Sequence, residues 1–345
     1  MMVARPDAKP LHTFPGRRSL LGWLMDDPRP ASIHSLSRRA LPPAQPVKAR
    51  GVRIHPKMTP DDAFRAILSD CLSQMTANAG VLRAGRSTEG LHQLRVGLRR
   101  LEVALHAFAE AFKQTWLEEL RGRGKVLSAR LGPARDLDVF LEELLAAPAK
   151  VFASEDDMEM FAPLRAHGEI AREQAWKRVH ACIASQDFAV FLDDVAGLAQ
   201  SRLPLAHDSR LRPMASRILE RQARRAKKRG RAARSHEEGD LHRLRIALKK
   251  LRYTAEFFAP LYAAKKVKRY IAKVKRLQES LGRLNDIAHA RSVVAELAPL
   301  SQKNTASLRF AAGTVQGWYG ARRPRLVKKT MKRWGRLKSV TPFWA

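Results

Sequence analysis

The sequence is poor in the features that define several large classes of protein. Its 345 residues include only two cysteines, Cys71 and Cys182, which are too few for a disulfide framework or a zinc cluster. No stretch of eighteen apolar residues occurs, so we expect no membrane-spanning helix. Aromatic residues make up 7% of the chain, which leaves little for a base-stacking platform. These shortages favour a protein of a reducing compartment, and we expect a cytoplasmic location.

Acidic residues are scarce in the second half of the chain. Residues 206–345 hold 36 basic and 9 acidic side chains, whereas residues 57–205 hold 19 and 21, and residues 1–56 hold 10 and 3. The net charge is +32. An imbalance of this size predicts a polyanionic partner, and its distribution places most of the binding in the second half.

Motifs for catalysis are also missing. The sequence has no phosphate-binding P-loop, no Gly-rich cradle, no HExxH pair and no acidic metal cluster. Arginines close to the histidines would oppose a bound cation. We therefore expect no catalytic residue, no metal site and no cofactor.

The hydrophobic periodicity predicts an all-α protein. Residues 1–56 are rich in Pro, Arg, Ser and Ala without a sustained period, which predicts a disordered tail. From residue 57 onward amphipathic helical patterns follow one another, and a linker at 202–213 divides them into halves at 57–205 and 206–345. The expected helices are 61–83, 89–113, 116–131, 136–147, 157–184, 188–202, 214–234, 240–260, 264–281, 286–298, 304–319 and 325–338.

One helix occurs twice. LHQLRVGLRRLEVALHAF begins at Leu91, and LHRLRIALKKLRYTAEFF begins at Leu241, an offset of 150 residues. The match runs without a gap from 91–138 onto 241–288, so two helices and their connection are duplicated. This predicts two helical bundles related by pseudo-symmetry.

Each copy has an apolar stripe and a basic stripe. On a helical wheel the leucines gather on one side, and the basic residues gather about 100° away. Cations three or four residues apart repel one another, so an anionic ligand is needed to offset the repulsion. A solvated helix face is the alternative for a single helix, and the duplication argues against it. The stripe consists of His92, Arg95, Arg99 and His106 in the first copy, and His242, Arg245, Lys249 and Arg252 in the second.

The connection after the second duplicated helix allows two interpretations. Gly132 and Gly282 follow the last leucine, where glycine commonly ends a helix, and Asp136 and Asp286 then stand where an N-cap would begin the next. Alternatively, each carboxylate orients the neighbouring histidine or an arginine of the repeated helix. Further basic stretches at 217–234, 265–276 and 322–338 extend the positive surface.

The segments L-H-x-L-R-x-x-L-R/K-R/K-L and L-G-x-x-R/N-D resemble the CHAD family, the conserved histidine α-helical domain. The resemblance covers about 57–300. It implies an all-α fold of two four-helix bundles related by a pseudo-twofold, with a basic face that binds inorganic polyphosphate, and some members are associated with polyphosphate granules. The implied polyphosphate contacts are His92, Arg95, Arg99, Arg100, His242, Arg245, Lys249 and Arg252, with Arg123, Arg130, Lys273 and Arg276 on the following helices.

The chain departs from the pattern at two positions. The first copy has Glu102 where the second copy has Arg252, and it has Arg135 where the second copy has Asn285. The acid on the first basic stripe predicts that the second copy carries most of the binding. The E-x-E-x-K strand of the CYTH domain, which accompanies CHAD in some relatives, is absent from this sequence.

The sequence is compatible with three functions. The first is non-catalytic polyphosphate binding, associated with granules. The second is binding of DNA or RNA, which the net charge of +32 supports and the low aromatic content opposes. The third is an enzyme acting on polyphosphate or a nucleotide, which the missing motifs oppose. We expect nucleic acid to be the weaker polyanionic partner.

Overall fold

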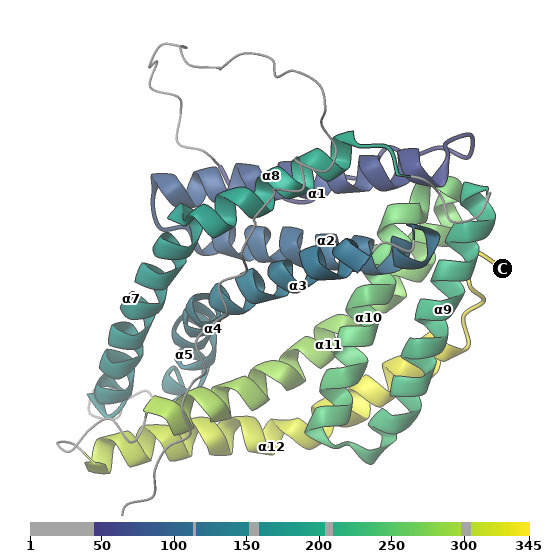
Figure 1. Cartoon of the computed structure of the whole chain (residues 1–345). Coiled ribbons are helices and arrows are strands. Elements are labelled where there is room, and N and C mark those ends of the chain that lie inside the picture. The colour runs from purple at the N-terminus through teal and green to yellow at the C-terminus, as the bar shows by residue number, and fades with distance from the viewer. Residues whose placement is uncertain (1–44, 113–114, 152–158, 204–209, 298–304) are drawn as a thin grey trace, which may run out of the picture. The chain divides into compact units, whose positions relative to one another are not determined.

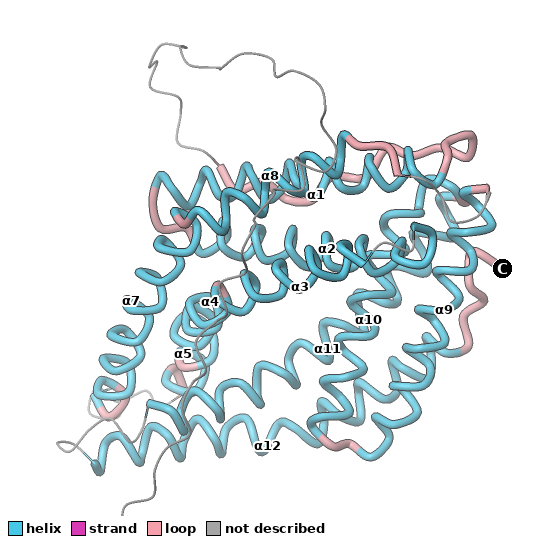
Figure 2. Tube along the Cα trace, viewed as in Figure 1, coloured by secondary structure: helices cyan, strands magenta, loops and turns pink. Residues whose placement is uncertain are grey.

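The structure is a computed structural model that describes residues 45–112, 115–151, 159–203, 210–297 and 305–345. Within these ranges every regular element is a helix (Figure 1). Figure 2 shows the same part of the chain as helices joined by short loops, without a strand. The expected all-α class is therefore confirmed.

The described helices of the first half follow the predicted order. α1 and α2 are long and antiparallel neighbours, α3 packs on α2, and α8 lies along α1. A π-helical turn interrupts the segment after α3. The bounds are α1 (Pro60–Ala84), α2 (Thr88–Phe112), α3 (Thr115–Arg130), α4 (Gly132–Val139), the π-helix η2 (Phe140–Leu144), α5 (Ala146–Ala149), α7 (Ala162–Ala184) and α8 (Gln186–Gln200).

The second half uses fewer and longer helices. α9 packs on α10, and α11 packs on both α10 and α12. The bounds are α9 (Leu211–Ala232), the 3₁₀ turn η3 (Ala233–Ser235), α10 (Glu238–Phe258), the 3₁₀ turn η4 (Ala259–Leu261), α11 (Ala264–Leu297) and α12 (Thr305–Lys338).

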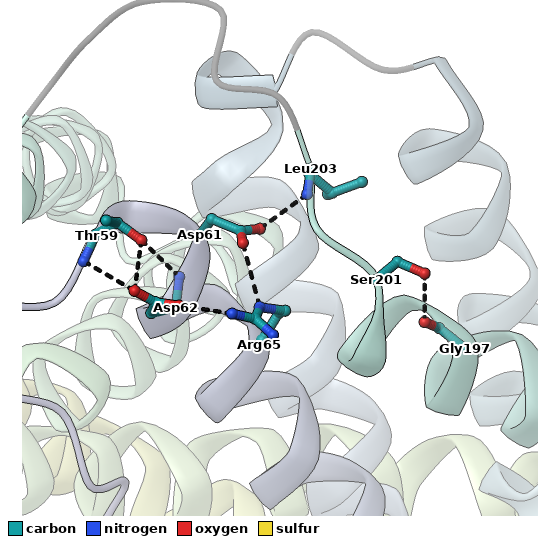
Figure 3. Close-up of polar contacts among 7 residues, drawn as sticks. All are labelled: Thr59, Asp61, Asp62, Arg65, Gly197, Ser201 and Leu203. Carbon is teal, nitrogen blue, oxygen red and sulfur yellow. Dashed lines mark hydrogen bonds and ion pairs between the residues drawn. The ribbon is translucent and has the colours of Figure 1, made fainter. Parts of the chain in front are cut away.

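The start of α1 is fixed by a capping box (Figure 3). The backbone N–H of Asp62 donates to Thr59 Oγ1 at 3.1 Å, and the backbone N–H of Thr59 donates to Asp62 Oδ2 at 3.4 Å. Asp61 Oδ1 accepts the backbone N–H of Leu203 at 3.1 Å, so the segment after α8 is tied to the first turn of α1. Proline at position 60 suits the first helical residue, which has no intrahelical acceptor for an N–H.

Removing the Thr59 hydroxyl should destabilise the fold without changing it. Thr59→Ala leaves the Asp62 N–H without its acceptor, and loss of such a cap costs about 1 kcal/mol of the free energy of unfolding. Urea denaturation followed by circular dichroism measures the change. Thr59→Ser, which keeps the oxygen, is the control and should lose less than half as much; equal losses in both variants would contradict the capping role.

The repeated leucines form the core, as the periodicity predicts. In α2 the five leucines are at most 2% exposed, and in α10 the four leucines are at most 5% exposed. The buried leucines are Leu91, Leu94, Leu98, Leu101, Leu105, Leu241, Leu244, Leu248 and Leu251.

Equivalent residues of the two copies meet inside this core. Phe108 of α2 and Phe258 of α10 are 150 residues apart, and their rings lie with centroids 5.8 Å apart. Phe64 of α1 stacks on Phe108 at 4.8 Å and joins α1 to the same cluster. A residue that contacts its own equivalent lies where a twofold axis would pass, so this contact is consistent with the predicted pseudo-twofold arrangement.

The capping interpretation of the two aspartates is wrong. α4 already begins at Gly132, so Asp136 lies inside it, and Asp286 lies in the middle of α11, which runs unbroken through Gly282. Leu277, Leu281 and Leu284 continue one buried stripe across that glycine. Burial of this stripe outweighs the cost of about 1 kcal/mol for glycine in a helix interior. The two helices expected at 264–281 and 286–298 are therefore one.

A similar correction applies to the C-terminal helices. The patterns at 304–319 and 325–338 belong to one helix, α12, with Pro324 inside it. Proline removes one backbone hydrogen bond, but Val315 before it and Val327 and Trp334 after it are all buried. Packing on both sides of Pro324 therefore keeps the helix continuous.

The folded part begins earlier than composition indicates. Asn78 of α1 accepts the backbone N–H of Val47 at 3.1 Å and donates to its carbonyl at 2.8 Å. Val52 and Ile54 are each 5% exposed. Residues 45–56 thus pack on the helical core through a few apolar side chains that a Pro- and Arg-rich composition hides. The expected disorder of residues 1–44 lies outside the described residues.

No helix in the described ranges is both long enough and apolar enough to span a bilayer. The two cysteines, Cys71 and Cys182, are both buried and unpaired.

Candidate polyanion site

α2 and α10 contact each other, and their basic stripes share one cavity. This α2–α10 groove has a volume of about 260 Å³. Because each stripe lies beside a leucine stripe that enters the core, burying the leucines turns the cations toward the junction of the two helices. Its charged lining consists of Arg99 and Glu102 from α2, and His242, Arg245, Lys249 and Lys250 from α10.

The cations of the groove are close enough to perturb one another. Burial, and then the charges of Arg99 and Arg245, lower the pKa of Lys249 from 10.5 to about 6. Burial also lowers the pKa of Arg95, and Arg99 and Arg245 lower it further. Arg95, Arg99, Arg245 and Lys249 come in equivalent pairs from the two copies, so the duplication produces one cluster of positive charge that needs a counter-charge.

The two aspartates accompany the two arginines. Asp136 opposes the lowering of the Arg95 pKa, and Asp286 opposes the lowering of the Arg245 pKa. Asp286 is itself half-buried, and this burial raises its pKa. Each carboxylate therefore stabilises the charge on an arginine of the repeated helix, while no direct ion pair joins either couple in the described part of the chain.

The guanidinium of Arg95 is held by the backbone between α3 and α4. Its Nη1 donates to the carbonyl of Leu131 at 3.0 Å. A Cβ on Gly132 would lie 3.2 Å from the same Nη1, tighter than an ordinary contact. The small residue at position 132 therefore gives the guanidinium room at the start of α4, which the sequence pattern alone attributes to helix ending.

The two family histidines have different surroundings. His242 Nδ1 lies 3.0 Å from Asn285 Oδ1 on α11, and His242 is exposed. Burial lowers the pKa of His92, and the charge of the adjacent Arg135 lowers it further. Positions 135 and 285 are equivalent in the two copies. Asn285 forms a hydrogen bond with His242, whereas Arg135 disfavours a positive charge on His92.

Glu102 lies in the groove, as the sequence predicts, but cations from both copies surround it. Arg121 Nη1 lies 3.9 Å from its carboxylate, and Lys250 Nζ lies 4.0 Å from it. The equivalent residue, Arg252, pairs with Glu256 at 3.7 Å. Both residues are thus partly neutralised by neighbours of opposite charge. The local charge of the two copies therefore differs less than the exchange of Glu102 for Arg252 indicates.

Several residues in the predicted contact set lie away from the groove. Arg100 is 3% exposed and pairs with Asp70 at 2.5 Å, because it is turned about 100° from Arg99 toward α1. Arg123 pairs with Asp194, and Arg130 lies 4.0 Å from Asp187. The other predicted residues outside the groove lining are His92, Arg95, Arg252, Lys273 and Arg276.

Sequence reasoning missed Lys250 as a lining residue and the contact between His106 and Arg225. Lys250 lines the groove although its equivalent, Arg100, is buried. Next to it, His106 Nε2 lies 2.7 Å from Arg225 of α9, and burial followed by the charge of Lys250 lowers the His106 pKa to about 4. The tilt of one helix on another decides these contacts, and periodicity within one helix carries no information about it.

The fold and the site define an all-α protein whose duplicated helices meet at a cationic groove. The sequence profile of the CHAD domain matches residues 66–295, two thirds of the chain. The chain belongs to the CHAD family.

Two solved structures are similar. The CHAD domain from the plant Ricinus communis shares 25% identity, with a TM-score of 0.71 over 86% of this chain and 98% of that one. PptA from Streptomyces chartreusis shares 19% identity, with a TM-score of 0.63 over 82% of this chain and 100% of that one. No curated protein matches the sequence.

Proposed function

We propose that this protein binds inorganic polyphosphate in the α2–α10 groove without hydrolysing it. The observation that carries the proposal is the cluster of Arg95, Arg99, Arg245 and Lys249, which two copies of one helix contribute to a single site. Burial of like charges is unfavourable, and a ligand with several negative charges offsets it.

The chemistry of the lining suits phosphate. Arginine presents a planar fork of N–H donors that matches pairs of phosphate oxygens, and lysine adds a compact charge. Each phosphate of the chain carries a negative charge, so binding releases counterions and weakens with salt. Because both stripes run along their helices, the groove favours an extended anion.

The proposal is binding without hydrolysis. The carboxylates nearest to the cluster, Glu102, Asp136 and Asp286, each lie beside cations. In the described ranges no group of three or more Asp, Glu, His or Cys side chains could hold a metal ion, whereas phosphoryl-transfer enzymes commonly use such a metal. We place the protein in the cytoplasm, on polyphosphate granules.

Competition binding tests the proposed ligand. Fluorescently labelled long-chain polyphosphate is bound to the full chain, and unlabelled polyphosphate or duplex DNA is added at matched phosphate concentration. We expect polyphosphate to displace the label at least tenfold more effectively, because the low aromatic content offers bases little stacking surface. Equal displacement by DNA would refute selectivity, and phosphate release with Mg²⁺ would refute a non-catalytic role.

A further inference from the structure

Two more cavities lie in the second half of the chain. His242 lines the groove and also a second cavity of about 260 Å³, which Arg243, Asn285 and Arg323 border. Glu238 is the one carboxylate in the lining of this second cavity. The groove and the second cavity therefore share a residue and have His242 between them.

One hydrogen bond links the lining of the second cavity to that of a third. Arg323 of α12 borders the second cavity and donates from Nη2 to the carbonyl of His236 at 2.7 Å. His236 in turn lines a cavity of about 520 Å³. We call this third cavity the α9–α12 corner. Its polar lining consists of Arg234, His236, Lys338 and Ser339, above an apolar floor of Met331 and Trp334.

The corner is built by close helix packing. Trp334 of α12 packs so tightly on α9 that a Cβ on Gly230 would lie 2.0 Å from its ring. His236 has a φ of 60°, which is the left-handed backbone conformation that residues other than glycine rarely adopt. Such backbone conformations often occur at functional sites, and here one holds a histidine at the edge of the cavity.

The two cations of the corner have no acidic partner among the described residues. Arg234 and Lys338 take part in none of the ion pairs found among the described residues, although Arg224 and Arg243 nearby do. The sequence has no acidic residue from position 297 to the C-terminus. Two cations without an ion pair and an imidazole around one cavity are suited to phosphate oxygens, whereas the Ser339 hydroxyl already donates to the carbonyl of Arg336.

We propose that the α9–α12 corner is a second phosphate-binding site, and that one polyphosphate chain runs from the α2–α10 groove past His242 and Arg323 into it. The proposal rests on the proposed function. It makes the protein selective for long chains, because a chain anchored in the groove reaches the corner at a high effective concentration. A short chain occupies the groove alone.

The test compares two chain lengths in two charge-matched variants. Arg234→Ala/Lys338→Ala removes the corner cations, and Lys177→Ala/Arg178→Ala removes two exposed cations of α7 that line none of the three cavities. Affinities for long-chain polyphosphate and for tripolyphosphate are measured over a range of salt concentrations. Circular dichroism and thermal melting check that each variant folds.

The corner variant should bind long chains about tenfold more weakly and tripolyphosphate less than twofold more weakly. Its salt dependence for long chains should fall by about 1.4 on a log–log plot, for two lost phosphate contacts. The α7 variant should behave like the unaltered protein. His236→Gly, which relieves the left-handed backbone, should lower long-chain affinity without destabilising the fold.

Three results would overturn the second site: equal losses for both chain lengths, losses no larger than in the α7 variant, or an equal loss of duplex DNA binding, which would make the corner a general polyanion surface. A failure of the proposed function looks different. In that case the unaltered protein binds neither chain length, and the groove variants described below change nothing.

Discussion

Replacing Arg99 and Lys249 together with alanine should weaken polyphosphate binding about 100-fold. These equivalent residues line the groove from opposite helices. A hydrogen bond to a charged group is worth about 1.5 kcal/mol or more, so two lost contacts cost about 3 kcal/mol. Each 1.4 kcal/mol corresponds to a factor of ten in affinity. Fluorescence titration with labelled long-chain polyphosphate measures the loss.

The same variant should fold at least as well as the unaltered protein. Arg99 and Lys249 repel each other, and the positive charge of Arg99 lowers the pKa of Lys249. Removing this repulsion should leave the melting temperature unchanged or raise it. Arg95 and Arg245 are kept in this variant because Asp136 and Asp286 accompany them. Unchanged affinity would show that the groove is not the site.

Polyphosphate binding should take up a proton at Lys249. Burial and the surrounding arginines lower its pKa to about 6, so at pH 8 the amine is mostly neutral in the ligand-free protein. A bound anion favours the charged form and raises the pKa toward its ordinary value. Affinity should therefore fall as the pH rises above 6, by up to tenfold per pH unit, until the pH reaches the pKa of the bound state.

Lys249→Arg separates this effect from other titrations. Arginine stays charged throughout the range, so the variant should lose the pH dependence between pH 7 and 9 and bind more tightly than the unaltered protein at pH 9. Calorimetry in buffers of different ionisation enthalpy counts the proton directly. The prediction fails if no proton is taken up at pH 8, or if Lys249→Arg has the same pH profile as the unaltered protein.

The lowered pKa also affects folding of the ligand-free protein. Between pH 6 and about 10 the unfolded chain carries a proton on Lys249 that the folded chain lacks. This contribution to the free energy of unfolding therefore rises with pH across the window and is lost as the pH falls toward 6. Urea denaturation at pH 7 and pH 9, compared with Lys249→Met, isolates it, because methionine cannot titrate.

Sequence periodicity predicted the helices and the buried leucines well. A leucine every third or fourth residue specifies one apolar stripe, and the stripes of α2 and α10 both enter the core. The duplication also identified Arg95, Arg99, Arg245 and Lys249 as one set. Periodicity overestimated the number of breaks in the second half, because glycine and proline interrupt a helix only where packing does not hold it, and both Gly282 and Pro324 lie within packed helices.

The neighbours of the predicted cations could not be derived from sequence. Arg99 and Arg100 are adjacent and chemically identical, yet one lines the groove and the other pairs with Asp70 in the interior. The capping interpretation of Asp136 and Asp286 was wrong, and the arginines that they accompany became visible only in the folded chain. The π-helical turn at Phe140–Leu144 had no sequence signal.

The sequence by itself determined that this chain is helical, that it carries a large positive charge, and that one His-Arg helix is present twice, because these are properties of local spacing and composition. Only the tertiary structure decided that the two copies contact each other, that Lys249 lies among arginines, and where the three cavities form. The physical reason is that charges far apart in the sequence interact only after the core brings them within a few ångströms, and burial of the leucines sets that geometry.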